Sequence, residues 1–146
     1  MGWTVVADNH IGDWGTQFGK LIVSWRGDFN EEAFEADPIG ELERLYVQFG
    51  QNETPESAAA ARAETAKLQA GDAENLSLWC QFIDVSMREF NKVYDRLGVA
   101  FDETLGESAY NEALSGVVAD LLEVNIATQS DGAVVVAFPK DSENKR

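Results

Sequence analysis

The spacing of apolar residues predicts a mostly helical chain that begins with a strand. Residues 3–7 are apolar or β-branched on both faces, which is typical of a buried strand in a parallel sheet. A polar loop follows, and a helix with Asp13 as its N-cap is expected next. Its apolar residues recur at helical spacing, at Trp14, Phe18, Leu21, Ile22 and Trp25. Residues 1–27 are therefore expected to form a strand–loop–helix unit.

Three more helices are predicted within residues 28–98. The acidic stretch 28–37 lacks periodicity and is expected to be a solvated connector. A helix then starts at Asp37-Pro38 and ends at Gly50, and an Ala-rich helix starts at Thr54-Pro55. The second has only Leu68 as a large apolar residue and is expected to pack shallowly. The third, residues 72–97, has an apolar stripe expected to lie in the core: Trp79, Phe82, Ile83, Met87, Phe90, Val93, Tyr94 and Leu97.

Residues 99–138 are predicted to contain a short strand, a helix and a hairpin. Residues 99–101 suit the short strand, and Ser108 is a suitable cap for the helix. The helix is expected to turn Leu114, Val117, Val118, Leu121 and Leu122 inward. Residues 126–129 and 133–138 flank Ser130-Asp131-Gly132, a sequence that favours a tight hairpin turn. The tail 139–146 is polar and expected to fray.

The first strand poses a topological problem. A buried parallel strand needs neighbours on both sides, and each parallel neighbour requires a crossover of about a dozen residues or more. The hairpin and residues 99–101 are poor candidates for such neighbours. We therefore expect one partial α/β domain over residues 1–146. It would be helix-rich, with an orphan strand, about five helices and a C-terminal hairpin, and its other strands would lie outside this sequence.

Composition narrows the class of protein. The chain has 146 residues, of which 45% are hydrophobic, so it is not expected to be wholly disordered. It has no apolar run long enough to span a membrane and no signal-peptide pattern. Its single cysteine, Cys80, excludes a disulfide framework and fits a cytoplasmic protein. The net charge of −15 and scattered basic residues mean that another protein segment would have to supply most of the attraction to nucleic acid.

The loop at residues 8–15 is the strongest candidate for chemistry. It lies between the carboxyl end of a strand and the N-terminus of a helix, where ligands of α/β sheets bind. Its glycines match no nucleotide-binding motif, and a simple capped turn is the alternative interpretation. His10 with Asp8 and Asp13 falls short of a zinc ligand set, so no metal site is expected and His10 is expected to be a hydrogen-bonded structural residue.

Two other features have plain structural interpretations. Cys80 has no histidine near it in the sequence and no basic cluster, so a catalytic thiol is not expected. Gly106-Glu107-Ser108 precedes a predicted helix, and a turn followed by a cap accounts for it.

Four segments resemble one family. Asn-His-Ile-Gly-Asp-Trp-Gly-Thr-Gln-Phe-Gly at 9–19 resembles a signature of arginyl-tRNA synthetases. Residues 38–42 are similar to the family's connector helix, and residues 84–97 to its long helix. Residues 106–110 resemble a further signature. The resemblance covers nearly the whole chain and is weakest in the Ala-rich helix and the tail.

The resemblance implies part of a class I synthetase with a Rossmann-like nucleotide-binding fold. Such enzymes activate arginine with ATP and magnesium and transfer it to the 3′-terminal adenosine of tRNA in the cytoplasm. Trp14 and Glu107 match positions near that adenosine. Asn9, His10, Asp13 and Gln17 match the signature and are expected to shape the floor of the site without transferring protons.

The departures from the family are also informative. Both ATP signatures and the segment that holds the guanidinium group are absent, so the chain corresponds to the stretch between the signatures. No complete catalytic set and no metal ligands are expected, and the chain alone is expected to be inactive. It is expected to self-associate through residues 3–7 rather than to bind membranes. A free-standing acidic helical interaction module and a small enzyme using the 8–13 loop are the alternatives.

Overall fold

The computed structural model describes residues 2–138, which divide between Glu107 and Ser108 into two compact units. The first unit contains the helices α1 (Thr16–Asp28), α2 (Glu31–Ala36), α3 (Pro38–Gln51), α4 (Pro55–Gln69) and α5 (Ala73–Leu97). A 3₁₀ turn, η1 (Glu107–Tyr110), crosses the division. The second unit then contains α6 (Leu114–Glu123), β1 (Thr128–Ser130) and β2 (Ala133–Val135). The helix-rich class with a C-terminal hairpin is confirmed.

Several predicted helix ends are confirmed by their hydrogen bonds. Asp37 Oδ1 accepts from the Gly40 amide at 3.0 Å, and Thr54 and Ser57 form a reciprocal capping box. Asp72 Oδ1 accepts from the Asn75 amide, also at 3.0 Å. Gly98 ends α5 with a φ of 67°, a left-handed conformation that glycine adopts without a Cβ penalty.

Three local predictions are wrong. Asp13 does not cap α1, which follows Gly15 without a side-chain cap. Ser108 does not cap α6, which starts at Leu114 and also lacks a side-chain cap. The predicted connector 28–37 contains the helix α2, because Asn30 accepts a hydrogen bond from the Ala33 amide at 2.9 Å and begins a helical turn.

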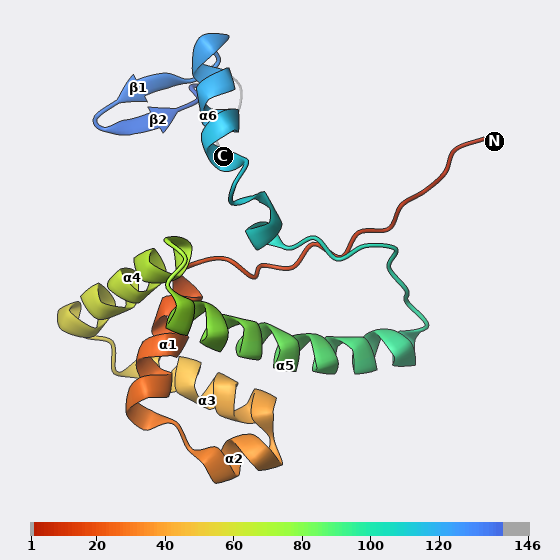
Figure 1. Cartoon of the computed structure of the whole chain (residues 1–146), viewed down its shortest axis with the longest axis vertical. Coiled ribbons are helices and arrows are strands. Elements are labelled where there is room, and N and C mark those ends of the chain that lie inside the picture. The colour runs from red at the N-terminus through yellow and green to blue at the C-terminus, as the bar shows by residue number, and fades with distance from the viewer. Residues whose placement is uncertain (1, 139–146) are drawn as a thin grey trace, which may run out of the picture. The chain divides into compact units, whose positions relative to one another are not determined.

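The core of the first unit lies where α1 meets α3, α4 and α5 (Figure 1). Its buried members come from all four helices, at Phe18, Ile22, Leu42, Leu68, Phe82 and Val85. The prediction that α4 packs shallowly is wrong. A Cβ added at Gly19 would lie only 2.1 Å from the Ala61 carbonyl oxygen, so the two helix backbones approach closely. Small residues on α4 allow this approach.

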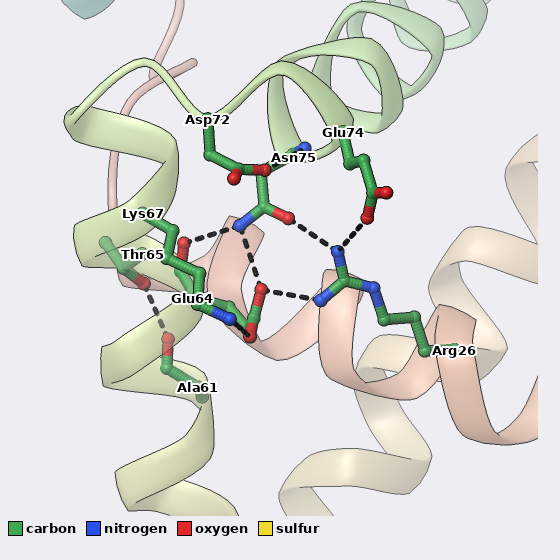
Figure 2. Close-up of polar contacts among 8 residues, drawn as sticks. All are labelled: Arg26, Ala61, Glu64, Thr65, Lys67, Asp72, Glu74 and Asn75. Carbon is green, nitrogen blue, oxygen red and sulfur yellow. Dashed lines mark hydrogen bonds and ion pairs between the residues drawn. The ribbon is translucent and has the colours of Figure 1, made fainter.

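A polar network also joins α1, α4 and α5 (Figure 2). Asn75 is fully buried, donates to Glu64 Oε2 at 2.9 Å and accepts from Arg26 at 2.7 Å. Glu64 also pairs with Arg26 and with Lys67, each at 2.7 Å. Burial alone favours the neutral acid, but the hydrogen bonds from Lys67, Asn75 and Arg26 outweigh it and hold the pKa of Glu64 at about 2.

The apolar stripes of two helices are only partly covered. Phe82 on α5 is 1% exposed, but Phe90, Val93 and Leu97 farther along the same helix are exposed. No residue of α6 is buried among the residues that the structure describes. The predictions of a continuous α5 core stripe and of an inward α6 face are therefore wrong for this chain. A stripe indicates a face that avoids water, but it does not specify what covers that face.

The first predicted strand, at residues 3–7, does not form, and its residues are not buried here. Trp3, Val5 and Val6 are exposed at 92%, 82% and 60%. The segment pairs through one parallel bridge, between Asp8 and Glu103. Its neighbour thus lies within the chain, at Glu103, two residues after the segment 99–101. No strand forms at 99–101.

The C-terminal hairpin is confirmed in a shorter form. β1 and β2 pair antiparallel, with Thr128 opposite Val135. Asp131 and Gly132 form the turn with φ values of 48° and 80°, as two-residue hairpin loops require. The predicted fraying of residues 139–146 lies outside the described residues. Across residues 2–138, no helix has the length and apolar character needed to cross a membrane.

Candidate functional site

Residues 7–13 and 102–107 lie side by side in the first unit. The Ala7 amide donates to Asp102 Oδ2, and the Asp102 amide donates back to the Ala7 carbonyl, both at 2.8 Å. The Asn9 amide continues the pairing by donating to the Glu103 carbonyl at 2.9 Å. Two segments more than ninety positions apart in the sequence are thereby joined.

Beyond Asn9 the pairing continues through side chains. The Leu105 amide donates to Asp8 Oδ1 at 3.0 Å. The Leu105 carbonyl lies 2.7 Å from His10 Nδ1, and since a carbonyl can only accept, Nδ1 carries the proton. The Glu107 amide then donates to the Ile11 carbonyl at 3.0 Å. His10 is therefore hydrogen-bonded, as predicted.

Gly106 is required by the close approach of Asp13. A Cβ added at Gly106 would lie 2.4 Å from Asp13 Oδ1, and Asp13 itself is 5% exposed. Any larger residue at 106 would displace the carboxylate or the loop. The buried Asp13 thus packs against the segment that leads into Glu107 instead of capping α1.

The loop is also fixed against α1 and α5. Gln17 Nε2 donates to the Gly12 carbonyl at 3.3 Å, and Trp79 Nε1 donates to the Asp13 carbonyl at 2.7 Å. The half-buried Trp14 ring meets the Trp79 ring nearly perpendicularly, with centroids 5.5 Å apart. Helical spacing predicts Trp79 only as a core residue and does not indicate its contact with the loop.

A cavity of about 370 Å³ adjoins the loop. It is lined by residues 9–13, by Phe18 of α1 and by four residues of α5: Ile83, Ser86, Phe90 and Tyr94. Asn9 is 8% exposed, and its Oδ1 accepts from the Tyr94 hydroxyl at 3.4 Å. Its Nδ2 has no hydrogen-bond partner among the described residues.

The charged groups around the loop are acidic. Asp8, Asp13, Asp102, Glu103 and Glu107 all lie on the two paired segments. Within residues 2–138, no group of three or more His, Cys, Asp or Glu side chains is placed to hold a metal ion. The arrangement can position a ligand by shape and hydrogen bonding, but it provides little attraction for phosphate.

The predicted site residues lie on or beside the two paired segments. Asn9, His10 and Asp13 line the cavity, and Gln17 fastens the loop beside it. Glu107 bonds through its backbone to Ile11, three positions before Trp14. The hydrogen bonds that Asp8 and Tyr94 make here are not predicted from the sequence. Asp8 has a recognisable signal, since it is the first polar residue after the apolar segment.

Comparison with known proteins identifies the family. The catalytic-domain model described as tRNA synthetases class I (R) matches residues 1–144. The arginine–tRNA ligase of Fusobacterium nucleatum is 50% identical over 140 residues, covering 94% of this chain and 25% of that protein. The ligase of Clostridium perfringens is 49% identical over 137 residues, covering 92% and 24%.

A solved structure shows the same fold. The crystal structure of arginyl-tRNA synthetase from Plasmodium falciparum matches with a TM-score of 0.72 and 27% identity, covering 92% of this chain and 22% of that one. The chain spans about a quarter of the length of the curated relatives it matches. On the match over residues 1–144, the chain belongs to the family of class I (R) tRNA synthetase catalytic domains.

Proposed function

We propose that this chain forms part of the catalytic domain of an arginine–tRNA ligase. In the reaction, the arginine carboxylate attacks the α-phosphorus of ATP and releases pyrophosphate. A ribose hydroxyl of the tRNA 3′ end then attacks the arginyl carbonyl and releases AMP. The observation that carries the proposal is the pairing of the 9–19 signature with residues 105–107, because it unites two separate matching segments in one site. None of the comparisons favours a free-standing interaction module.

Trp14 and Glu107 are proposed to contact the 3′-terminal nucleotide of the tRNA. Support comes from the hydrogen bond between the Glu107 amide and the Ile11 carbonyl, which keeps Glu107 close to the loop that carries Trp14. An indole ring can stack on a base, worth about 1–3 kcal/mol. A carboxylate can accept a hydrogen bond from a ribose hydroxyl, worth about 1.5–3 kcal/mol.

Asn9, His10, Asp13 and Gln17 are proposed to hold the floor of this site. Each acts through the backbone or the cavity wall: His10 through Leu105, Asp13 against Gly106 and Gln17 through Gly12. Catalysis then depends on positioning rather than on a nucleophilic side chain.

ATP and its magnesium are proposed to bind elsewhere in the ligase. The described residues do not fit them, since the two paired segments carry no Lys or Arg and residues 2–138 hold no set of three metal-binding side chains. We further propose that residues 1–146 form one partial domain and that the ligase acts in the cytoplasm.

The proposal is tested with a chimeric ligase, in which this chain replaces the matching 140 residues of the Fusobacterium nucleatum enzyme. We expect the chimera to charge arginine tRNA. We expect the 146-residue chain alone to stay at background in arginine-dependent ATP–pyrophosphate exchange with tRNA present.

Two results would contradict the proposal. One is a chimera that folds, with a thermal transition near that of the parent enzyme, but charges no tRNA. The other is exchange activity in the isolated chain that is lost when Asp8 or Asp13 is substituted, which would favour a small independent enzyme.

A further inference from the structure

We infer that Asp8 and His10 are a pair of positioning residues that orient Glu107 by holding both sides of the Leu105 residue. Asp8 Oδ1 accepts from the Leu105 amide at 3.0 Å, and His10 Nδ1–H donates to the Leu105 carbonyl at 2.7 Å. This inference rests on the proposed function and names residues that act on the same site without touching the tRNA.

The geometry explains why two side chains are needed. Up to Glu103 the two segments pair mainly through their backbones, and at Glu107 the backbone pairing resumes with Ile11. Leu105 lies in the gap between these pairings, and its amide and carbonyl bond to the side chains of Asp8 and His10. Removing either side chain leaves one peptide group of this turn free to rotate, two residues before Glu107.

The two bonds are expected to order the turn more than they stabilise the fold. Asp8 and His10 are exposed, and Leu105 is 38% exposed, so water can replace a lost bond at little cost in folding free energy. The loss of a bond instead leaves the backbone between Leu105 and Glu107 without a fixed orientation. A site that depends on positioning responds to such a loss even when the protein remains folded.

Conservative variants separate the loss of the hydrogen bonds to Leu105 from other effects of changing the two side chains. Asp8→Asn keeps an oxygen that can accept from Leu105, and His10→Asn keeps an N–H near the Nδ1 position. Asp8→Ala and His10→Ala keep neither. Thr104→Ala is the matched control, because Thr104 is exposed, lies next to Leu105 and has no side-chain bond among the described residues.

The first experiment uses this chain and nuclear magnetic resonance. We expect the His10 ring nitrogens to report a proton on Nδ1. We expect Asp8→Ala to speed exchange of the Leu105 amide by about tenfold, and Thr104→Ala to leave it unchanged. A proton on Nε2 alone, or unchanged Leu105 exchange in Asp8→Ala, would overturn the inference.

The second experiment measures steady-state charging by the chimeric ligase. Asp8→Ala and His10→Ala should each lower kcat/KM for tRNA by about tenfold, with the KM for arginine within about twofold of the parent chimera. Asp8→Asn and His10→Asn should recover most of the loss. The double alanine variant should lose less than the product of the two single effects, because both act on one residue.

Glu107→Gln in the same ligase distinguishes a failure of this inference from a failure of the proposed role of Glu107. If Glu107→Gln impairs tRNA charging while Asp8→Ala and His10→Ala do not, this inference fails and the proposed function stands. If Glu107→Gln leaves charging unchanged, the proposed role of Glu107 fails. Equal losses in the arginine and tRNA parameters of the alanine variants, without rescue by asparagine, would indicate a merely structural role and also overturn the inference.

Discussion

Glu64 shows how a carboxylate stays ionised in a mostly buried position. Its side chain is 12% exposed, yet it accepts bonds from Arg26, Lys67 and Asn75. Its pKa falls from the ordinary value of 4.5 to about 2 because these donors outweigh the desolvation. A lowered pKa in the folded state adds stability above pH 4.5, and this stability is lost as the pH falls from 4.5 towards 2.

Glu64→Gln should therefore lower the free energy of unfolding at pH 7 by about 1–3 kcal/mol. It should also flatten the fall in stability between pH 4.5 and 2. Urea unfolding across this pH range measures both effects. Glu74→Gln is the control: its side chain is 88% exposed and 3.7 Å from Arg26, so a change below about 0.5 kcal/mol is expected. Equal pH profiles for wild type and Glu64→Gln would refute the assignment.

Individual residues also show what the sequence could and could not predict. The caps at Asp37, Thr54 and Asp72 were predictable because a cap is a local interaction, with its partner three residues away. Asp13 has the same local pattern but packs against Gly106, more than ninety positions away. A rule based on residues close in the sequence cannot detect that packing against Gly106 replaces capping.

At the scale of elements, α4 packs on α1 through small residues. Its sequence has little apolar area, which led to the prediction of shallow packing. However, Ala61 and Thr65 are 3% and 6% exposed, and they lie directly against Gly19. The two helices pack through close contact of their backbones instead of through large apolar side chains. The spacing of apolar residues does not predict this kind of packing.

Gly19→Ala should destabilise the first unit by about 1–3 kcal/mol, because its Cβ would lie 2.1 Å from the Ala61 carbonyl oxygen and 2.2 Å from Thr65 Oγ1. Gly27→Ala, on the same helix, meets nothing within 4 Å and should raise stability by up to about 1 kcal/mol. Denaturant titration of the two variants gives opposite signs if the packing is correct. A neutral Gly19→Ala would show that α1 and α4 lie farther apart.

α5 shows the opposite error, because its apolar stripe predicts more burial than the described residues have. Periodicity correctly located the helix and its face, and the inner half around Phe82 is buried. The outer half is exposed among the described residues, at Phe90, Val93 and Leu97. Amphipathic patterns predict elements well, but they do not identify the partner that an apolar face meets.

At the scale of the whole molecule, the segment at residues 3–7 presents an open edge. Its backbone bonds to Asp102 and Glu103 only at Ala7, while Trp3, Val5 and Val6 are exposed. Unpaired apolar edges recruit other strands. The sequence predicts a strand here with its parallel neighbours outside the chain. In the structure residues 3–7 form no strand, and the adjacent Asp8 makes its one parallel bridge to Glu103 of the same chain.

We predict that the isolated chain self-associates through this edge. Sedimentation at rising concentration should show a dimer, and Val5→Lys should shift the equilibrium towards monomer by adding a charge to the edge. Val134→Lys, on the exposed hairpin, is the control and should leave the equilibrium unchanged. A strict monomer at millimolar concentration would show that the edge does not associate.

The central claim is that two distant segments form one site for the tRNA 3′ end, and charging kinetics of the chimeric ligase test it most directly. Trp14→Ala and Glu107→Gln should each lower kcat/KM for tRNA by about tenfold or more, with little change in the KM for arginine. Weaker arginine binding with unaltered tRNA kinetics in these two variants would contradict the account.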